Sequence, residues 1–253
     1  MTQDAAQRID QATILMRFCA ATDASGAPRV DPEGRQRQSE LESELKTLEP
    51  GHPDRALLLS LIGEAYKMRY VATGNVRFLD QALESSKRGV AQAEPDDPVR
   101  PRLLAHVADA RIKRFAVSRD PAELRLAAMA LREGLQIASA GHPERIRLLS
   151  QLGVALSWLG LQHGDVDALH EVNDVFATLV NDTPPADPRR GNVLQLHASF
   201  LQDRHHYSGD RADLDGAVEA AREALRCAHP YDVRIPQYQA KLRELETMTA
   251  VRR

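Results

Sequence analysis

The sequence contains few aromatic residues and few cysteines. Phe, Trp and Tyr make up 4% of its 253 residues, a low share for the core of a globular enzyme. The two cysteines, Cys19 and Cys227, are far apart, and neither has another cysteine or a histidine at the spacing of a zinc site. We therefore expect two small buried thiols in a reducing environment, and no bound metal or cofactor.

Long hydrophobic runs and an excess of one charge are also missing. No apolar stretch approaches the ~20 residues that a membrane-spanning helix needs, and residues 1–22 lack the basic and apolar regions of a signal peptide. The 33 basic and 36 acidic residues nearly balance, so the composition gives no basic surface for nucleic acid. These absences predict a soluble, cytoplasmic protein with neither a membrane nor a nucleic-acid partner.

A short string recurs through the sequence at a fixed interval. Each copy begins with His or Asp, continues with Pro and ends with Arg, and successive copies start 45 residues apart. The four copies are His52–Arg55, Asp97–Arg100, His142–Arg145 and Asp187–Arg190. Because the missing N–H of proline costs nothing in the first turn of a helix, each copy predicts the beginning of a helix.

Core and turn positions keep their character at the same interval. The recurring leucines are Leu59, Leu104, Leu149 and Leu194, and the recurring small residues are Gly63, Ala108, Gly153 and Ala198. The turns are Gly74-Asn75, Arg119-Asp120, Gly164-Asp165 and Gly209-Asp210. An Asn or Asp in this place can cap the helix that follows. Each repeat is therefore predicted to be a helix, a tight turn and a second helix.

This periodicity predicts an all-α fold, an α-solenoid of tandem antiparallel helical hairpins. One hairpin cannot bury its own apolar stripe, so neighbouring hairpins must stack. We expect one continuous solenoid made of residues 1–50 as a helical hairpin or cap with a long loop, 51–230 as four repeats, and 231–253 as a capping helix.

Outside the four repeats, apolar spacing indicates further helices. We expect them at residues 3–22, 36–49 and 234–250, with a loop from Thr22 to Glu33. His229-Pro230 looks like a fifth turn that is slightly out of register with the others.

The first repeat resembles a tetratricopeptide (TPR) repeat. The resemblance lies in His52-Pro-Asp-Arg, then Leu-Leu-Ser-Leu-Ile-Gly-Glu-Ala-Tyr, then Thr-Gly-Asn and Leu-Asp-Gln-Ala, and residues 194–215 are close to the same pattern. More narrowly, it is similar to a long-turn variety common in actinobacterial proteins, where such arrays often accompany caspase-like (CHAT) peptidase domains. The resemblance covers about residues 51–228. It implies a concave surface, lined by the first helix of each hairpin, that holds a peptide or partner protein.

Two repeats depart from the pattern, and no trace of the peptidase domain is found. The second repeat has Arg119-Asp120-Pro121 at its turn, without a glycine. The third has Gly160 where the others have Tyr70, Phe115 and His205. These departures concern local geometry rather than the architecture.

First-helix positions that the core does not require are the candidate partner-binding residues. They are Ser60, Glu64, Lys67, Asp109, Lys113, Trp158, Gln195 and Gln202. The charged members fall in the first two repeats, so we expect a surface of mixed charge there and a more neutral surface later. Trp158 can anchor a ligand side chain or fill the core, and the sequence leaves both possibilities open.

The adjacent histidines His205 and His206 suggest a metal site only weakly. Neighbouring residues on a helix point about 100° apart and chelate poorly, and a third ligand such as His197 or Asp203 would be needed. His205 shares its register with aromatic residues of other repeats, which favours a role in core packing. His163 and His170 flank a turn and are expected to face solvent or to cap a helix.

Basic residues near the turns have two interpretations. Arg111, Lys113 and Arg114 can meet an acidic partner or a phosphate, or they can form a solvated helix face. The shared register of Arg69, Arg114 and Arg204 predicts that they support the turns, against acidic residues downstream.

Three functions remain open at this point. The first is a non-catalytic interaction scaffold or regulatory module that binds a peptide or partner protein on its concave face. The second is an enzyme or ligand-sensing subunit built on a helical scaffold, with a site in the C-terminal repeats, although no catalytic motif stands out. The third is self-assembly into a homodimer through apolar residues of the segment 3–22.

Overall fold

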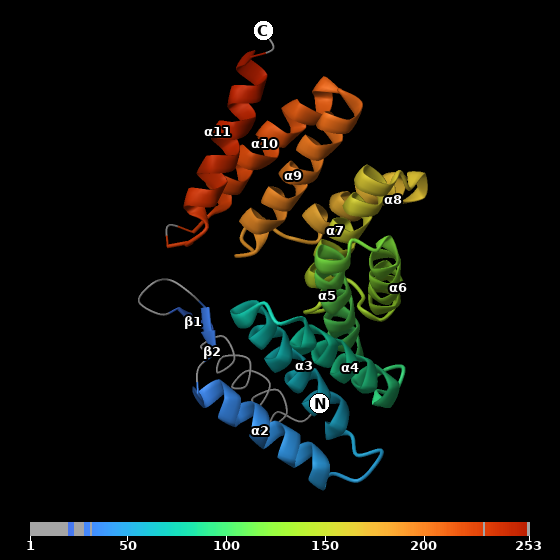
Figure 1. Cartoon of the computed structure of the whole chain (residues 1–253). Helices are drawn as coiled ribbons and strands as arrows, with labels where there is room; N and C mark the ends of the chain where they lie inside the picture. Colours follow the sequence, from blue (N-terminus) through green and yellow to red (C-terminus); the bar gives the residue numbers. More distant parts are fainter. Residues whose placement is uncertain (1–19, 23–27, 31, 230, 252–253) are drawn as a thin grey trace. The chain divides into compact units, whose positions relative to one another are not determined.

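Helices follow one another in antiparallel pairs along the chain (Figure 1). The computed structural model describes residues 20–22, 28–30, 32–229 and 231–251. The chain divides into two compact units, Met1–Ser139 and Ala140–Arg253, and each is described by itself. None of the described helices is long and apolar enough to cross a membrane.

The first unit contains a short hairpin and five described helices. Its elements are β1 (Ala20–Thr22), β2 (Pro28–Val30), α2 (Pro32–Thr47), α3 (Asp54–Thr73), α4 (Val76–Gln92), α5 (Arg100–Ser118) and α6 (Pro121–Ile137). The second unit contains α7 (Arg145–His163), α8 (Val166–Asn181), α9 (Arg190–Ser208), α10 (Arg211–Cys227) and α11 (Ile235–Val251). The predicted hairpins correspond to the pairs α3–α4, α5–α6, α7–α8 and α9–α10, each of which packs closely.

The N-terminal region differs from the prediction. Residues 20–22 were expected in a helix, but they form β1, which pairs antiparallel with β2 inside the expected loop. This pairing satisfies backbone N–H and C=O groups that a loop would leave to water. Helix α2 also begins earlier than expected, at Pro32, because proline is tolerated in the first turn of a helix. The rest of the predicted first helix, with Cys19, lies outside the described residues.

The first residue of each repeated string closes the turn before a helix. Its side chain accepts a hydrogen bond from the backbone N–H two residues later. The acceptors are Nδ1 of His52 and His142 and Oδ1 of Asp97, Asp187 and Asp232, at 2.8–3.2 Å. Histidine and aspartate therefore serve the same purpose. The fifth turn begins at Asp232, 45 residues after Asp187, so the prediction that it is out of register was wrong. The proline of the string is replaced there by Val233, which hid the match.

In the first, second and fourth strings, the arginine that ends the string binds the end of the preceding helix. Nη1 of Arg100 donates to the carbonyl oxygens of Val90 and Ala93, at 2.9 and 3.0 Å. The same two bonds, to carbonyls 10 and 7 residues earlier, are made by Arg55 and Arg190. The last carbonyls of a helix have no partner within it, so this arginine supplies one. It also fixes the second helix of one hairpin to the first helix of the next.

Small residues allow the two helices of a hairpin to approach closely. A Cβ added to Gly63 would lie 2.8 Å from the Ser86 hydroxyl, and one added to Gly153 would lie 3.0 Å from the Phe176 ring. The recurring leucines are all buried, which confirms the register. At Gly160, the departure in the third repeat, the side chain of Leu169 fills the space that an aromatic residue occupies elsewhere.

The turns inside the hairpins use the residues that the sequence indicated. Asn75, Asp120, Asp165 and Asp210 each cap the following helix with their side chains. Gly74, Gly164 and Gly209 precede them with positive φ. In the second repeat Arg119 adopts the same conformation, with φ of 59°, which is unusual for a residue with a side chain. The absence of a glycine therefore leaves the turn unchanged.

Replacing Arg100 by Ala tests the arginine that joins successive hairpins. The Arg100 side chain is 19% exposed and binds two carbonyls and the carboxylate of Glu133. We expect Arg100→Ala to lower the free energy of unfolding by about 1.5–3 kcal/mol, the range for hydrogen bonds to charged groups. Urea unfolding followed by circular dichroism measures this. Arg125→Ala, which removes an exposed arginine of α6, is the matched control and should change stability by less than about 0.5 kcal/mol. Equal effects would contradict the role of Arg100.

Candidate interaction surface

Five of the eight predicted partner-binding residues meet between α3 and α5. Nζ of Lys67 lies 2.6 Å from Glu64 Oε1 and 3.7 Å from Asp109 Oδ2. Asp109 also pairs with Lys113, at 2.6 Å. The fifth residue, Ser60, joins the same group through a histidine. The first helices of two successive hairpins are thus connected by one chain of polar contacts, which we call the α3–α5 network.

His106 completes the α3–α5 network, and the sequence analysis missed it. Its Nδ1 lies 3.4 Å from Ser60 Oγ, and its Nε2 lies 3.3 Å from Glu64 Oε2. A Ser, a His and a Glu in this order resemble a hydrolytic triad. However, Ser60 is fully buried and His106 is 8% exposed, so a substrate cannot reach the hydroxyl. The sequence did contain a sign that His106 is unusual: the equivalent residue of the first repeat, 45 positions earlier, is Leu61.

The charged residues of the α3–α5 network balance one another and stay partly exposed. Two are basic, Lys67 and Lys113, and two are acidic, Glu64 and Asp109, with side-chain exposures between 14% and 29%. Ion pairs at this depth are less screened than pairs at the open surface. The mixed charge predicted for this part of the chain is therefore present, and each charge already has an internal partner.

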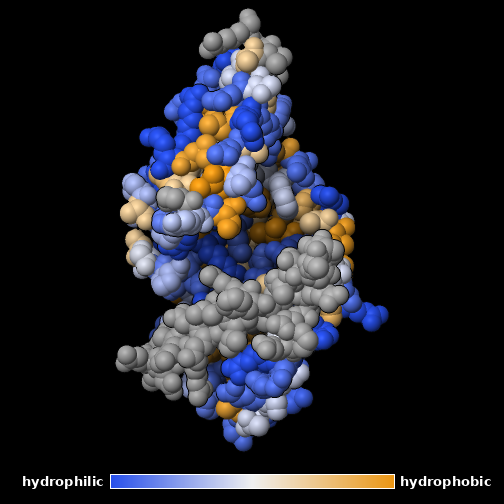
Figure 2. Space-filling view, turned by 90° about the vertical axis from the view of Figure 1, so that its left-hand side faces the viewer, coloured by the Kyte–Doolittle hydropathy of each residue, from blue (hydrophilic) through white to orange (hydrophobic). Residues whose placement is uncertain are grey.

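The second unit presents a more neutral set of candidates. In Figure 2, apolar residues gather between hydrophilic ones in the upper part of the view. Trp158 of α7 is partly buried. Gln195 of α9 is also partly buried, and its Oε1 accepts no hydrogen bond from the described residues. Gln202 is 4% exposed and binds Glu244 and Lys241 of α11, at 2.7 and 2.6 Å. Helix α11 therefore occupies the position that a partner of Gln202 would need.

Two of the three histidines of α9 have roles in packing, and the third, His206, is exposed. His205 is 2% exposed, and its Nδ1 lies 2.6 Å from the carbonyl oxygen of Asp210 across the turn. This confirms the packing interpretation of His205. His197 stacks on Phe176, which in turn stacks on Phe200, with ring centroids 5.4 and 5.1 Å apart. Within the described residues, no group of three His, Cys, Asp or Glu side chains is placed to hold a metal ion.

The exposure of two further histidines and of one cysteine can be compared with the predictions. His163 and His170 are both exposed, as expected. Cys227 is a free thiol that is only partly buried, so the prediction of full burial was wrong for it. It is the last residue of α10.

The basic residues of α5 are occupied by internal partners. Arg111 pairs with Glu123 at 2.8 Å, and Arg114 pairs with Glu123 at 2.9 Å and also with Asp80. Arg204 makes the equivalent pair with Asp213 in the fourth repeat, at 2.8 Å. These contacts confirm the prediction for Arg114 and Arg204. Arg69 differs, because the equivalent downstream residue is Phe78, and its guanidinium lies 4.0 Å from the centroid of that ring. The ion pairs of α5 favour the intramolecular interpretation of the basic cluster over a phosphate site.

Comparison with known proteins identifies the fold and no family. No family model matches the sequence, and no curated protein matches it. A crystal structure described as nearly identical TPR-like repeats, from a protein of Podosopora anserina assigned as a kinesin light chain, matches with a TM-score of 0.54. The sequence identity is 16%, and the match covers 89% of this chain and 100% of that chain. The chain therefore has a TPR-like helical repeat fold.

The stacked His197 makes stability depend on pH. Burial lowers the pKa of its imidazole, and the Arg204 guanidinium lowers it further. As pH falls below about 7, the unfolded chain takes up this proton before the folded chain does, near the ordinary pKa of 6.5. Protonation therefore favours unfolding, and the stability that His197 contributes is lost as pH falls through that window.

Comparing wild type with His197→Gln tests this dependence. The free energy of unfolding of both proteins is measured in urea between pH 5 and pH 8. We expect the value for the wild type to increase relative to that of the variant as pH rises. The difference between the two proteins removes the contribution of the other histidines. A difference that stays constant across this range would show that His197 contributes only through stacking.

Proposed function

We propose that the face formed by the first helices of the hairpins binds a segment of a partner protein. The α3–α5 network carries this proposal, because it presents partly exposed charges of both signs across two successive hairpins. TPR-like folds generally serve as scaffolds for protein–protein interaction, and repeat arrays offer extended surfaces for it. The protein acts here as a non-catalytic module.

The charges of the network suit a partner of alternating charge. Charged groups of the partner can replace the internal partners of these side chains. Carboxylates of the partner would then pair with Lys67 and Lys113, and its basic groups would pair with Glu64 and Asp109. Exchange of this kind contributes more to specificity and association rate than to affinity. In the second unit, Trp158 supplies an aromatic contact of the type that often dominates binding energy.

The identity of the partner follows only from the resemblance of the repeats. Arrays similar to residues 51–228 often accompany caspase-like peptidase domains in actinobacterial proteins, so such a peptidase is the first partner to test. A cytoplasmic location belongs to the same proposal.

Charge removal in the network tests the proposal. Partners are captured with the wild type, with the double variant Lys67→Ala and Lys113→Ala, and with the control Arg77→Ala and Arg125→Ala. Both variants lose two positive charges, but the control arginines are exposed on the second helices α4 and α6. We expect the affinity of a captured partner to fall about tenfold in the first variant alone, a typical effect for an interface residue. Thermal unfolding of each variant verifies that the fold persists. Equal affinity for both variants would exclude this face.

A further inference from the structure

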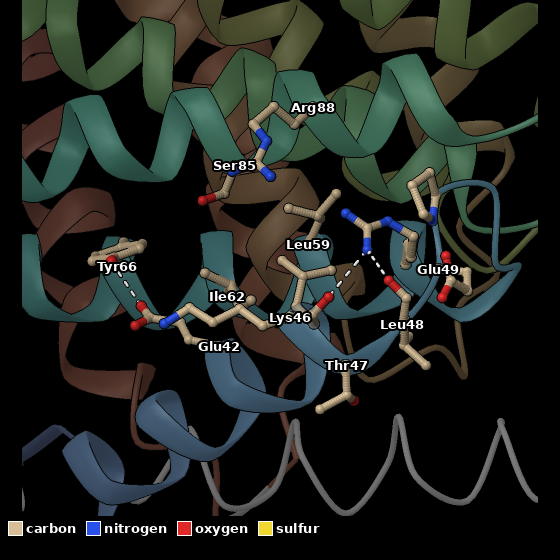
Figure 3. Close-up of a pocket in the computed structure, with 13 residues that line it drawn as sticks. Glu42, Lys46, Thr47, Leu48, Glu49, Leu59, Ile62, Tyr66, Ser85 and Arg88 are labelled. Atoms are coloured by element: carbon tan, nitrogen blue, oxygen red, sulfur yellow. Dashed lines mark hydrogen bonds between the residues drawn. The ribbon is translucent and has the colours of Figure 1, made fainter.

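Two pockets of the first unit are built from equivalent residues of successive repeats. The first has a volume of about 560 Å³ and lies between α2, α3 and α4 (Figure 3). The second has a volume of about 600 Å³ and lies between α4, α5 and α6. Adding 45 to the number of a residue in the first pocket gives its counterpart in the second, as in Arg55 and Arg100, Leu59 and Leu104, and Arg88 and Glu133. A difference between the pockets is therefore a difference at a defined position.

In the later repeats, a carboxylate neutralises the arginine that joins the hairpins. Arg100 pairs with Glu133 at 2.6 Å, and Arg190 pairs with Glu223 at 2.7 Å. Glu133 and Glu223 are 90 residues apart and hold the same position on their helices. In the third repeat, Arg145 pairs instead with Asp182, also at 2.6 Å. Each of these three arginines therefore has an acidic partner on the following second helix or, for Arg145, at its C-cap.

In the first repeat, both acidic positions hold other residues. Arg88 occupies the position of Glu133 and Glu223, and Gln92 occupies the position of Asp182. Nε of Arg55 donates to the neutral oxygen of Gln92, at 3.2 Å. Among the described residues, neither Arg55 nor Arg88 has an ion pair with a carboxylate. Within the part of the chain that the structure describes, the first pocket therefore has two arginines without an acidic partner, one of them the exposed Arg88, where its counterparts have an ion pair.

The remainder of the first pocket is lined by both apolar and polar side chains. Leu45, Leu59 and Ile62 line it, and Figure 3 shows Arg88 reaching from α4 toward Leu59. Lys46 adds a third positive charge, while Glu42 and Glu49 are the acidic lining residues. The carboxylate of Glu42 is engaged by the Tyr66 hydroxyl at 2.7 Å. The lining thus combines an apolar surface with a net positive charge.

We propose that this pocket binds a small aliphatic carboxylate. Its carboxylate group takes the place that the glutamates occupy in the second and fourth repeats, between Arg55 and Arg88. Its aliphatic chain lies on Leu59 and Ile62. The volume falls within the range of small-molecule sites, which are mostly apolar with a few placed polar groups. Arginine suits the task because its planar fork can bind a carboxylate through two parallel hydrogen bonds. This site is separate from the face that binds the partner protein.

Titration of the full chain with octanoate tests the proposal. Isothermal calorimetry should show saturable binding of one octanoate per chain. Two control ligands each lack one part of octanoate. Inorganic phosphate is an anion without an aliphatic chain, and 1-octanol has a similar aliphatic chain without a carboxylate. We expect each to bind at least about tenfold more weakly than octanoate, since each lacks one of the two contacts. Phosphate binding as tight as that of octanoate would overturn the proposed aliphatic ligand, and octanol binding as tight would overturn the role of the arginines.

Two variants place a carboxylate inside the pocket, where it competes with the carboxylate of the ligand for Arg55. Arg88→Glu restores the ion pair of the other repeats, and Gln92→Glu supplies a carboxylate beside Arg55 while keeping Arg88. Both should weaken octanoate binding at least about tenfold and should leave the thermal midpoint unchanged or raised. Arg77→Glu, on the same helix and outside the pocket, changes the net charge as much as Arg88→Glu does and should bind octanoate like the wild type. Unchanged affinity in both pocket variants, or an equal loss in Arg77→Glu, would overturn the assignment.

Discussion

An arginine at the start of a repeat fixes the end of the preceding helix to the beginning of the next hairpin, as Arg55, Arg100 and Arg190 show. It donates to carbonyls 10 and 7 residues earlier, at the C-terminal end of the preceding second helix. Those carbonyls carry the negative end of the helix dipole and lack partners within the helix. Because both bonds start from one guanidinium, the turn between them has little freedom in length. An insertion there would break the two bonds together, which gives a physical reason for the constant length of the connection between hairpins, one part of the 45-residue period.

The features that follow from local chemistry could be predicted from the sequence. The buried leucines, the close approach at Gly63 and the capping by Asn75 each depend on residues near in sequence, and the repeat displays them four times. What a neighbouring helix covers could not be predicted. Gln202 was expected to face a partner, but α11 covers it. His106 of α5 contacts Ser60 and Glu64 of α3, and its difference from Leu61 in the first repeat does not identify those partners.

The α3–α5 network serves stability and recognition with the same side chains. Its ion pairs join two successive first helices, and their partial burial raises the cost of leaving a charge without a partner. A binding partner must therefore replace each internal contact that it displaces, so the net gain in free energy is small for each pair. Recognition on this face depends on matching the order of charges, and a partner with the wrong order leaves buried charges unpaired.

Departures from a regular repeat carry different information from the repeat itself. Where Gly160 replaces an aromatic residue, Leu169 fills the space, so the departure is compensated within the hairpin. The departures at Arg88 and Gln92 differ, because no described carboxylate compensates Arg55 in the way that Glu133 compensates Arg100. Arg55 and Arg88 line the same pocket and repel each other, and an anion bound between them would lessen that repulsion. Comparing equivalent positions of the repeats thus distinguishes two kinds of substitution. At Gly160, a neighbouring side chain fills the space, whereas at Arg88 and Gln92 a place for a ligand is left.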